Sequence, residues 1–312
     1  MKKAIIALAA VVALAACSKE ETIIADRGDA IGFGTPFVEN STRVDYSTPG
    51  ALTQFNVYGT VTGTAGTVNI YEGVEVTKTQ QNGTDIGDAG SWWYAAGDAQ
   101  YWIPGASYNF AAIVDATVAT KDTYRMPLTL TTQADAAMYL KDMLYATATA
   151  SVNAQGTPSA NPVNFNFSHL LSKVKFTVTS NAMGGYYHTV TGIKVSNFET
   201  GTYTIANGTW AGGTASDVDF AEIANVTNAT GAKSNAERLL VPNADSFNVT
   251  FTVDLYKNGT KLGTETKNIT VNQDLVKGNS YNFTIACSVG NPIKFGVTND
   301  PSWTTQPDIA IQ

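Results

Sequence analysis

The sequence has few of the residues on which metal binding and acid–base catalysis usually depend. Among 312 residues there are only two cysteines and two histidines. His169 and His188 are far apart, and neither has a carboxylate or a cysteine at metal-ligand spacing, so the sequence predicts no zinc site and no Ser-His-Asp arrangement. It also contains no P-loop and no nucleotide-binding glycine pattern. We therefore predict that the protein is not an enzyme and has no metal site and no cofactor.

Charged residues are scarce as well. They make up only 14% of the chain, and the 26 acidic side chains outnumber the 19 basic ones, which gives a formal net charge of −7. This acidic balance argues against a nucleic-acid partner. The surface must instead be built largely from hydroxyl and amide groups, and the many threonine and tyrosine residues favour strands.

A long apolar run is missing everywhere except near the N-terminus. Behind two lysines, residues 4–16 are apolar but too few to cross a bilayer, which is typical of a signal segment. The run ends at Cys17 in the sequence Leu-Ala-Ala-Cys, which resembles the lipobox of bacterial lipoproteins. The resemblance implies that a signal peptide, residues 1–16, is removed and that Cys17 then carries lipid such as palmitate.

The residues behind Cys17 bear on where the lipoprotein goes. Ser18 takes the place where an aspartate would favour retention at the inner membrane, and the following Lys-Glu-Glu run is similar to the surface-export signal of Bacteroidetes lipoproteins. The similarity implies the outer membrane and the cell surface. The same run also fits a solvated spacer.

The shortage of cysteine excludes a disulfide framework. Once Cys17 is acylated, Cys287 has no partner, so stability must come from packing. Cys287 continues the alternation of Tyr281, Phe283 and Ile285, and we expect it on the apolar face of a strand.

Alternation of apolar and polar residues predicts an all-β protein. The clearest strand runs from Phe247 to Leu255, and the Asn258-Gly259 pair behind it is typical of a tight hairpin turn. Only residues 132–140 suggest a helix. Further strands are expected at residues 52–60, 67–77, 108–114, 124–130, 143–152, 174–179, 190–195 and 262–271.

A stretch of small and polar residues marks the best domain boundary. Residues 151–162 have almost no large side chain. We place one domain at residues 44–160 and a second at residues 161–312, and the second then opens with the alternation of Val163, Phe165 and Phe167.

Several parts of the chain together resemble the fimbrillin family of Bacteroidetes, which contains pilins of type V and related adhesin subunits. The resemblance rests on Ile-Gly-Phe-Gly-Thr-Pro-Phe at residues 31–37, on Thr42-Arg43, on residues 167–176 and on Leu-Leu-Val-Pro at residues 239–242. It implies two tandem transthyretin-like, Greek-key β-sandwiches. In polymerising members, an arginine-directed protease then removes the N-terminal segment.

The segment at residues 17–43 has the features of a removable strand. Ile31, Phe33 and Phe37 alternate, and the intervening glycines allow the backbone to approach its neighbours closely. A cut between Arg43 and Val44 would release the segment together with its lipid. Loss of a strand leaves an apolar groove and unpaired backbone groups, to which another strand can add.

The expected donor of that strand is the C-terminal tail of a neighbouring pilin subunit, with Ile309 and Ile311 at strand spacing. Such head-to-tail contacts make filaments, or fimbriae. The tail is short, and it could also pack within its own chain. Residues 31–37 could equally be a first strand that is never cleaved, and Arg27 is a rival cleavage site.

An aromatic group in the first half gives a second hypothesis. Trp92, Trp93 and Trp102 lie among glycines and tyrosines, and exposed rings could stack on sugars of a surface receptor. The protein would then be a glycan-binding surface lipoprotein that does not polymerise. If these rings instead fill a core, one of the adjacent Trp92 and Trp93 should be more exposed than the other.

Overall fold

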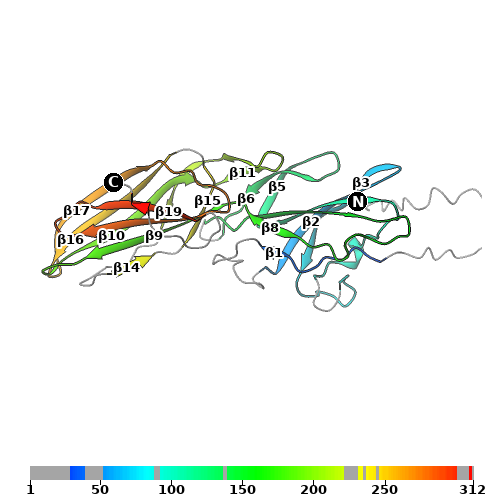
Figure 1. The fold of residues 1–312 in the computed structure, drawn as a ribbon, viewed down its shortest axis with the longest axis horizontal. Helices are drawn as coiled ribbons and strands as arrows, with labels where there is room; N and C mark the ends of the chain where they lie inside the picture. Colours follow the sequence, from blue (N-terminus) through cyan, green and yellow to red (C-terminus); the bar gives the residue numbers. More distant parts are fainter. Residues whose placement is uncertain are drawn as a thin grey trace, which may run out of the picture.

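The computed structural model describes residues 29–38, 52–87, 92–135, 139–220, 231–234, 237–243, 246–300 and 309–310. Cys17, Arg43, Val44 and Ile311 lie outside these ranges. Within them the chain forms strands and a single short 3-10 helix, Ala96–Asp98, and no helix is long and apolar enough to cross a membrane. The all-β prediction is confirmed, and Figure 1 shows an elongated molecule.

The first half of the chain supplies most of a six-stranded sheet. Its order is β1-β8-β7-β4-β2-β3. The strands are β1 (Phe37–Val38), β2 (Gln54–Gly63), β3 (Gly66–Thr77), β4 (Ser107–Val114), β7 (Leu144–Ser151) and β8 (Asn166–His169). All neighbours in it are antiparallel except β1 and β8, which run parallel.

A four-stranded sheet, which we call the bridging sheet, combines strands from both halves of the sequence. Its order is β12-β11-β6-β5. The strands are β5 (Ala116–Lys121), β6 (Pro127–Thr132), β11 (Gly201–Thr204) and β12 (Thr209–Gly212). The halves meet where β6 pairs with β11, with Leu130 opposite Tyr203.

The remaining strands form two sheets at the other end of the molecule (Figure 1). One has the order β13-β10-β16-β17, and the other has the order β14-β9-β18-β19-β20 with β15 also paired to β9. The first contains β10 (Tyr186–Phe198), β13 (Ala215–Asp219), β16 (Phe247–Lys257) and β17 (Thr260–Val271). The second contains β9 (Ser172–Asn181), β14 (Gly231–Ser234), β15 (Arg238–Leu240), β18 (Ser280–Ser288), β19 (Lys294–Asp300) and β20 (Ile309–Ala310).

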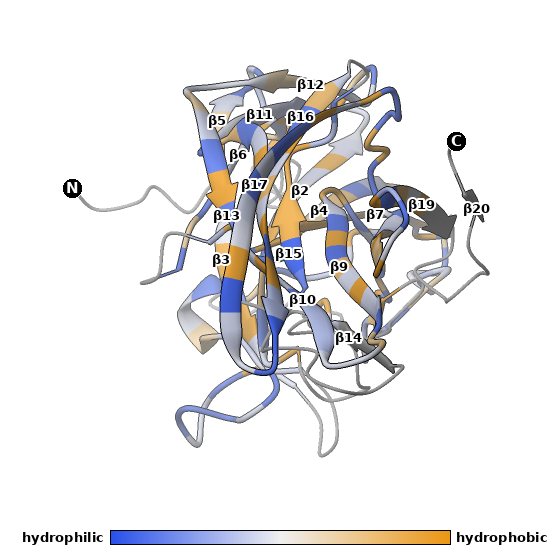
Figure 2. Cartoon of the chain, turned by 90° about the vertical axis from the view of Figure 1, so that its left-hand side faces the viewer, coloured by the Kyte–Doolittle hydropathy of each residue, from blue (hydrophilic) through white to orange (hydrophobic). Residues whose placement is uncertain are grey.

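The sequence patterns explain these strands well. In β16 the apolar residues from Phe247 to Val253 are buried and the polar residues between them are more exposed. Asn258 and Gly259 have φ values of 50° and 85°, as the tight turn between β16 and β17 requires. Figure 2 shows the same alternation as bands of hydrophobic and hydrophilic colour along β9.

The buried apolar residues form three clusters. The first cluster lies on one face of the six-stranded sheet, and the second fills the space between the two sheets at the far end. The third joins Tyr58 and Ile113 of the six-stranded sheet to Leu130 and Tyr203 of the bridging sheet. Cys287 belongs to the second cluster, in agreement with its place in the alternation.

Two expectations about local structure need revision. The helix expected at residues 132–140 is wrong: Thr132 ends β6, and Ala134 forms an isolated antiparallel bridge with Leu140. Tyr124 and its neighbours form a turn rather than the start of a strand, because Asp122 Oδ1 accepts the N–H groups of Tyr124 and Met126.

The residues just after the expected domain boundary lie in the first cluster. Val163, Phe165 and Phe167 pack there, and β8 pairs with β7. The division at residues 160 and 161, and with it the count of two tandem domains, stays a prediction.

Candidate functional site

The N-terminal segment, residues 29–38, lies against the first cluster and is held by backbone hydrogen bonds. After these contacts it enters β1, where Phe37 and Val38 pair with β8. Each bond joins the segment to a part of the chain that is distant in sequence. The bonds are Ile31 N to Gln100 O at 2.9 Å, Gly34 N to Val163 O at 2.9 Å, Val163 N to Gly32 O at 2.8 Å and Phe37 N to Phe165 O at 2.9 Å.

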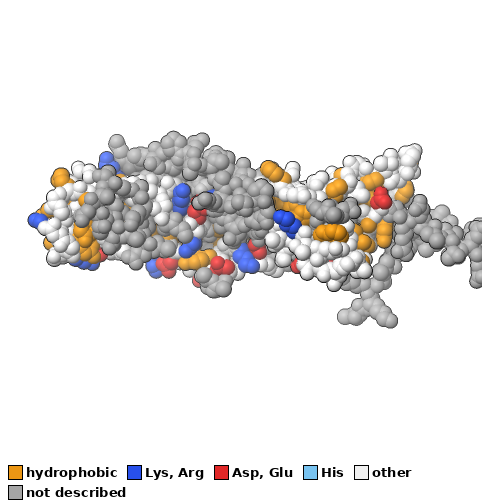
Figure 3. All heavy atoms as spheres, turned by 90° about the horizontal axis from the view of Figure 1, so that it is seen from below, with side chains coloured by type: hydrophobic (Ala, Val, Ile, Leu, Met, Phe, Trp, Pro, Cys, Tyr) orange, Lys and Arg blue, Asp and Glu red, His pale blue; other side chains and the backbone are white. Residues whose placement is uncertain are grey.

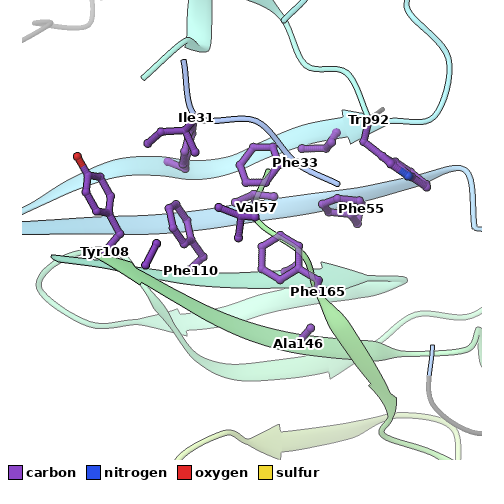
Figure 4. Close-up of a cluster of buried hydrophobic side chains, with 14 of the residues drawn as sticks. Ile31, Phe33, Phe55, Val57, Trp92, Tyr108, Phe110, Ala146 and Phe165 are labelled. Carbon is purple, nitrogen blue, oxygen red and sulfur yellow. The ribbon is translucent and has the colours of Figure 1, made fainter. Parts of the chain in front are cut away.

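Phe33 and Ile31 are the two most buried side chains of the segment, and Phe33 makes the larger set of ring contacts. It is 0% exposed, and Figure 4 shows its ring above Phe165 and beside Phe55. Such edge and stacked ring contacts stabilise beyond the area that they bury. Its ring centroid lies 6.5 Å from that of Phe55, 5.6 Å from Tyr71, 5.5 Å from Tyr94, 6.3 Å from Phe110 and 6.0 Å from Phe165.

Ile31 is also 0% exposed, and its carbonyl accepts a hydrogen bond from a buried side chain. The Tyr94 hydroxyl donates to Ile31 O at 2.7 Å. Burial raises the pKa of Tyr94 to about 12 and raises that of the neighbouring Tyr71 as well. Both phenols therefore stay neutral over the physiological range, and Tyr94 acts as a hydrogen-bond donor to the segment.

The two glycines of the segment differ in their surroundings. A Cβ atom at Gly34 would lie 2.1 Å from Asn164 Oδ1 and 3.1 Å from Pro162 Cγ. At Gly32 the nearest atom, Asn161 Oδ1, would be 3.4 Å away, which is close to ordinary contact. The close approach expected of the glycines therefore applies to Gly34. Asn161 Oδ1 also accepts the Gly32 N–H at 3.1 Å.

Phe37 does not share the burial of Ile31 and Phe33. It is 61% exposed, although its spacing predicts the same face. Regular alternation requires a continuous strand. Here the segment makes only isolated bridges at Ala30 and Phe33 before β1 begins, so the period is broken around Pro36.

The aromatic group of the first half belongs mostly to the core. Trp92 is 3% exposed and Trp102 is 5% exposed, and both lie in the first cluster. The backbone N–H of Trp92 points to Phe33 O at 3.4 Å, so this group is continuous with the packing around the segment. Trp93 is half-buried and thus more exposed than Trp92, in line with the alternation of adjacent residues. Rings that are buried in this way are not open to stacking on a sugar.

The described residues hold few other chemical groups that could form a site. They contain no group of three metal-binding side chains. Cys287 is buried, and burial raises the pKa of its thiol to about 11, so it is a poor nucleophile. His169 Nδ1 lies 2.9 Å from Asp142 Oδ1, and both side chains are buried, which is consistent with a structural role.

The C-terminal tail is described at two positions only. The backbone of Ile309 pairs with Val297 and that of Ala310 with Gly296, so β20 lies antiparallel to β19 of the same chain. The tail is thus placed in its own sheet in this structure.

Sequence reasoning missed Asn164 and Asp142. Asn164 stands between the alternating Val163 and Phe165, and this pattern could have suggested a strand but not its contact with Gly34. Asp142 precedes the apolar pair Met143-Leu144, and a lone acid in that position is a weak signal for burial.

These features define an all-β sandwich protein in which an N-terminal segment completes an aromatic core. A model of the fimbrillin-like family matches residues 42–301. The chain therefore belongs to the fimbrillin-like family. A comparison with curated proteins gave no match.

Several solved structures are similar to this chain. A proposed cell adhesion protein of Bacteroides ovatus is 16% identical with a TM-score of 0.52, and the match covers 90% of this chain and 99% of that one. A fimbrial assembly protein of Parabacteroides distasonis is 12% identical with a TM-score of 0.47, covering 91% and 100%. The fimbrial anchor protein Mfa2 of Porphyromonas gingivalis is 11% identical with a TM-score of 0.42, covering 88% and 98%.

Proposed function

We propose that this chain is a pilus or adhesin subunit without enzymatic activity, exported as a lipoprotein to the outer membrane and the cell surface. Its partners would be other pilin subunits and a surface receptor. Membership of the fimbrillin-like family supports this class of protein. The lipobox-like sequence at Cys17 supports the lipid anchor.

Assembly would proceed by strand exchange at the site of the N-terminal segment. The observation that carries this proposal is the complete burial of Ile31 and Phe33, which both belong to the N-terminal segment. Burying a side chain of this size stabilises by about 1.5–3 kcal/mol relative to exposure. Removing the segment would expose this apolar surface together with its aromatic neighbours, and refilling it would regain that free energy.

Backbone hydrogen bonding also favours refilling of the vacated site. Without the segment, the carbonyls of Gln100, Val163 and Phe165 would lose their partners. An incoming strand can satisfy such groups and add its side chains to the vacant positions. Because donor and acceptor surfaces differ, the contact repeats head to tail and builds an open filament.

The test is to identify the N-terminus of the protein recovered from the cell surface. We expect mass spectrometry of sheared surface protein to find Val44. Arg43→Ala should abolish both this product and assembled filaments, whereas Arg27→Ala serves as the matched control and should change neither. Filaments made from Arg43→Ala, or assembled protein that begins only at lipidated Cys17, would contradict cleavage at this arginine.

A further inference from the structure

Arginine is unevenly distributed along the chain. Residues 44–312, which would remain after the proposed cut, contain twelve lysines but only two arginines, Arg125 and Arg238. The much shorter stretch before them contains two more, Arg27 and Arg43. A protease that cuts after Arg43 therefore meets two further arginyl bonds in the part that it must leave intact, and the structure describes both of them.

Arg125 lies in the turn between β5 and β6, and its side chain gives it little protection. This side chain is 62% exposed, and exposed turns are preferred sites of nicking by proteases. The guanidinium group donates to Glu72 Oε1 at 2.9 Å, but an exposed ion pair stabilises little. Asn69, which lies on β3 together with Glu72, donates through Nδ2 to Tyr124 O at 2.8 Å. The ion pair alone cannot be what keeps this turn closed.

The backbone of the turn is closed by Asp122. Its carboxylate Oδ1 accepts the N–H groups of Tyr124 at 2.8 Å and of Met126 at 2.9 Å. Its own N–H donates to Met126 O at 2.9 Å, and its carbonyl accepts the Arg125 N–H at 3.0 Å. Arg125 has a φ of 63°, in the left-handed region. Proteases bind their substrates in an extended conformation, which this turn can adopt only by breaking these hydrogen bonds.

Arg238 is protected by the sheet in which it lies. It belongs to β15, where it pairs with Val174 of β9. Its guanidinium carbon lies 3.8 Å from the centroid of the Tyr139 ring. Leu239 and Leu240, which follow it, are buried. Cleavage after Arg238 would therefore require β15 to leave the sheet and two leucines to leave the core.

We propose that Asp122 protects the bond between Arg125 and Met126, so that a protease specific for arginine cuts the folded chain only within its first 43 residues. The pairing of β15 protects the bond after Arg238. The inference rests on the proposed cut after Arg43 and names the residue that confines cleavage to it. A cut after Arg125 would separate β5 from β6 and so divide the bridging sheet.

Limited proteolysis of the full chain tests the inference. The chain carries Cys17→Ser so that no lipid is attached, and it is incubated with clostripain, an endoprotease specific for arginine. Mass spectrometry identifies the fragments. The folded wild-type chain should be cut within its first 43 residues and not after Arg125 or Arg238, whereas the chain unfolded in urea should be cut at all of its arginines.

Removal of the Asp122 carboxylate should open the turn. The rate of cleavage follows the population of the open form when opening is fast, and Asp122→Ala removes two hydrogen bonds from the closed form. We therefore expect cleavage after Arg125 to become at least about tenfold faster. Asp122→Asn keeps an accepting oxygen and should keep the bond resistant. Glu72→Gln removes only the ion pair and should raise the rate less than Asp122→Ala does.

Asp85→Ala is the matched control. Asp85 Oδ2 also accepts two backbone N–H groups, those of Gln81 and Asn82, but in a turn without arginine. Its removal should leave the rate of cleavage after Arg125 unchanged. An equal increase in the Asp85→Ala and Asp122→Ala variants would show that Asp122 has no special role.

The outcomes separate this inference from the proposed function. Cleavage after Arg125 or Arg238 in the folded wild-type chain, as fast as after Arg43, would overturn it, as would an Asp122→Ala chain that stays resistant. If this variant is also cut after Arg238, it has unfolded as a whole, and hydrogen exchange of the Met126 amide in the wild-type chain then decides. Slow exchange supports the closed turn, and fast exchange overturns it. Absence of a cut after Arg43 would count against the proposed processing alone.

Discussion

Phe33 and Phe37 are the same residue type, four positions apart, in opposite surroundings. Phe33 is enclosed by aromatic rings and Phe37 is 61% exposed. We expect Phe33→Ala to lower the free energy of unfolding by about 3–5 kcal/mol because the surrounding rings cannot close the space. Phe37→Ala is the matched control and should change it by less than about 0.5 kcal/mol. Urea unfolding of the full chain measures both, and similar losses would contradict the assigned packing.

Two carboxylates of the chain allow a comparable contrast between a buried and an exposed position. Asp142 and His169 are buried and 2.9 Å apart, whereas the pair of Lys194 and Asp219 is exposed. Asp142→Ala should cost about 1–3 kcal/mol, since it removes the buried hydrogen bond between the carboxylate and His169 Nδ1. Asp219→Ala should cost less than about 1 kcal/mol. Thermal and urea unfolding should agree on the order, and a reversed order would show that Asp142 has no structural role.

Sequence alone can predict individual core residues where they follow a regular strand. Alternation predicts Cys287 on an apolar face, and this residue lies in the second cluster. The same rule fails for Phe37, which is exposed because the segment before it is not a continuous strand. The contact of Asn164 with Gly34 joins residues 130 positions apart, and no local pattern encodes such a pair.

At the scale of the element, the N-terminal segment can be tested through its two glycines. A Cβ atom at Gly34 requires the Asn164 side chain to turn away, whereas Gly32→Ala makes the same chemical change where space exists. Gly→Ala without strain is stabilising by about 0.4–1 kcal/mol, so Gly34→Ala should leave the segment less stable than Gly32→Ala does.

Removal of the Asn164 side chain supplies the control for this experiment. Combining Gly34→Ala with Asn164→Gly should restore much of the lost stability if the two side chains collide. The measurement is hydrogen exchange of the backbone amides of residues 31–37 in the wild-type chain, the two single variants and the double variant. Additive effects of the two changes would show that Asn164 is not the obstacle.

Predictions for whole elements are accurate where alternation is regular. The strand expected at residues 247–255 and the hairpin turn after it agree with β16 and its turn. The prediction of a helix at residues 132–140 fails because alanines and a leucine at helical spacing favour a helix. The bridge between Ala134 and Leu140 cannot be seen in the sequence. The pairing of β6 with β11 depends on residues some 70 positions apart and cannot be inferred from either strand.

At the scale of the whole molecule, buried phenols predict a loss of stability in alkali. Burial raises the pKa of Tyr94 and Tyr145 to about 12. Between pH 10 and 12 the unfolded chain ionises these groups and the folded chain does not, so stability falls by up to about 1.4 kcal/mol per pH unit for each group. Lys173 acts oppositely, since burial lowers its pKa, but it is a single group.

Urea unfolding at several pH values tests this expectation. Tyr145→Phe should flatten the decline above pH 10, whereas Tyr124→Phe, at an exposed position, should not. A wild-type protein whose stability is constant from pH 9 to 12 would contradict the burial of these phenols.

The surface of the molecule agrees with its composition at this scale. Figure 3 shows a face that is largely uncharged, with basic and acidic side chains close to one another. Glu72, for example, meets both Lys121 and Arg125. The described residues of this face therefore show no extended patch of one sign of the kind that attracts nucleic acid.

The bridging sheet has a mechanical consequence. In the proposed role of an adhesin or pilus subunit, the molecule would be pulled along its length when a cell is drawn away from the surface to which it adheres. Because β6 and β11 pair side by side and the third cluster packs beneath them, tension between the two ends of the molecule would not fall on one flexible linker. It would spread over a ladder of hydrogen bonds and the apolar contacts below, so the rod should stretch little before it breaks.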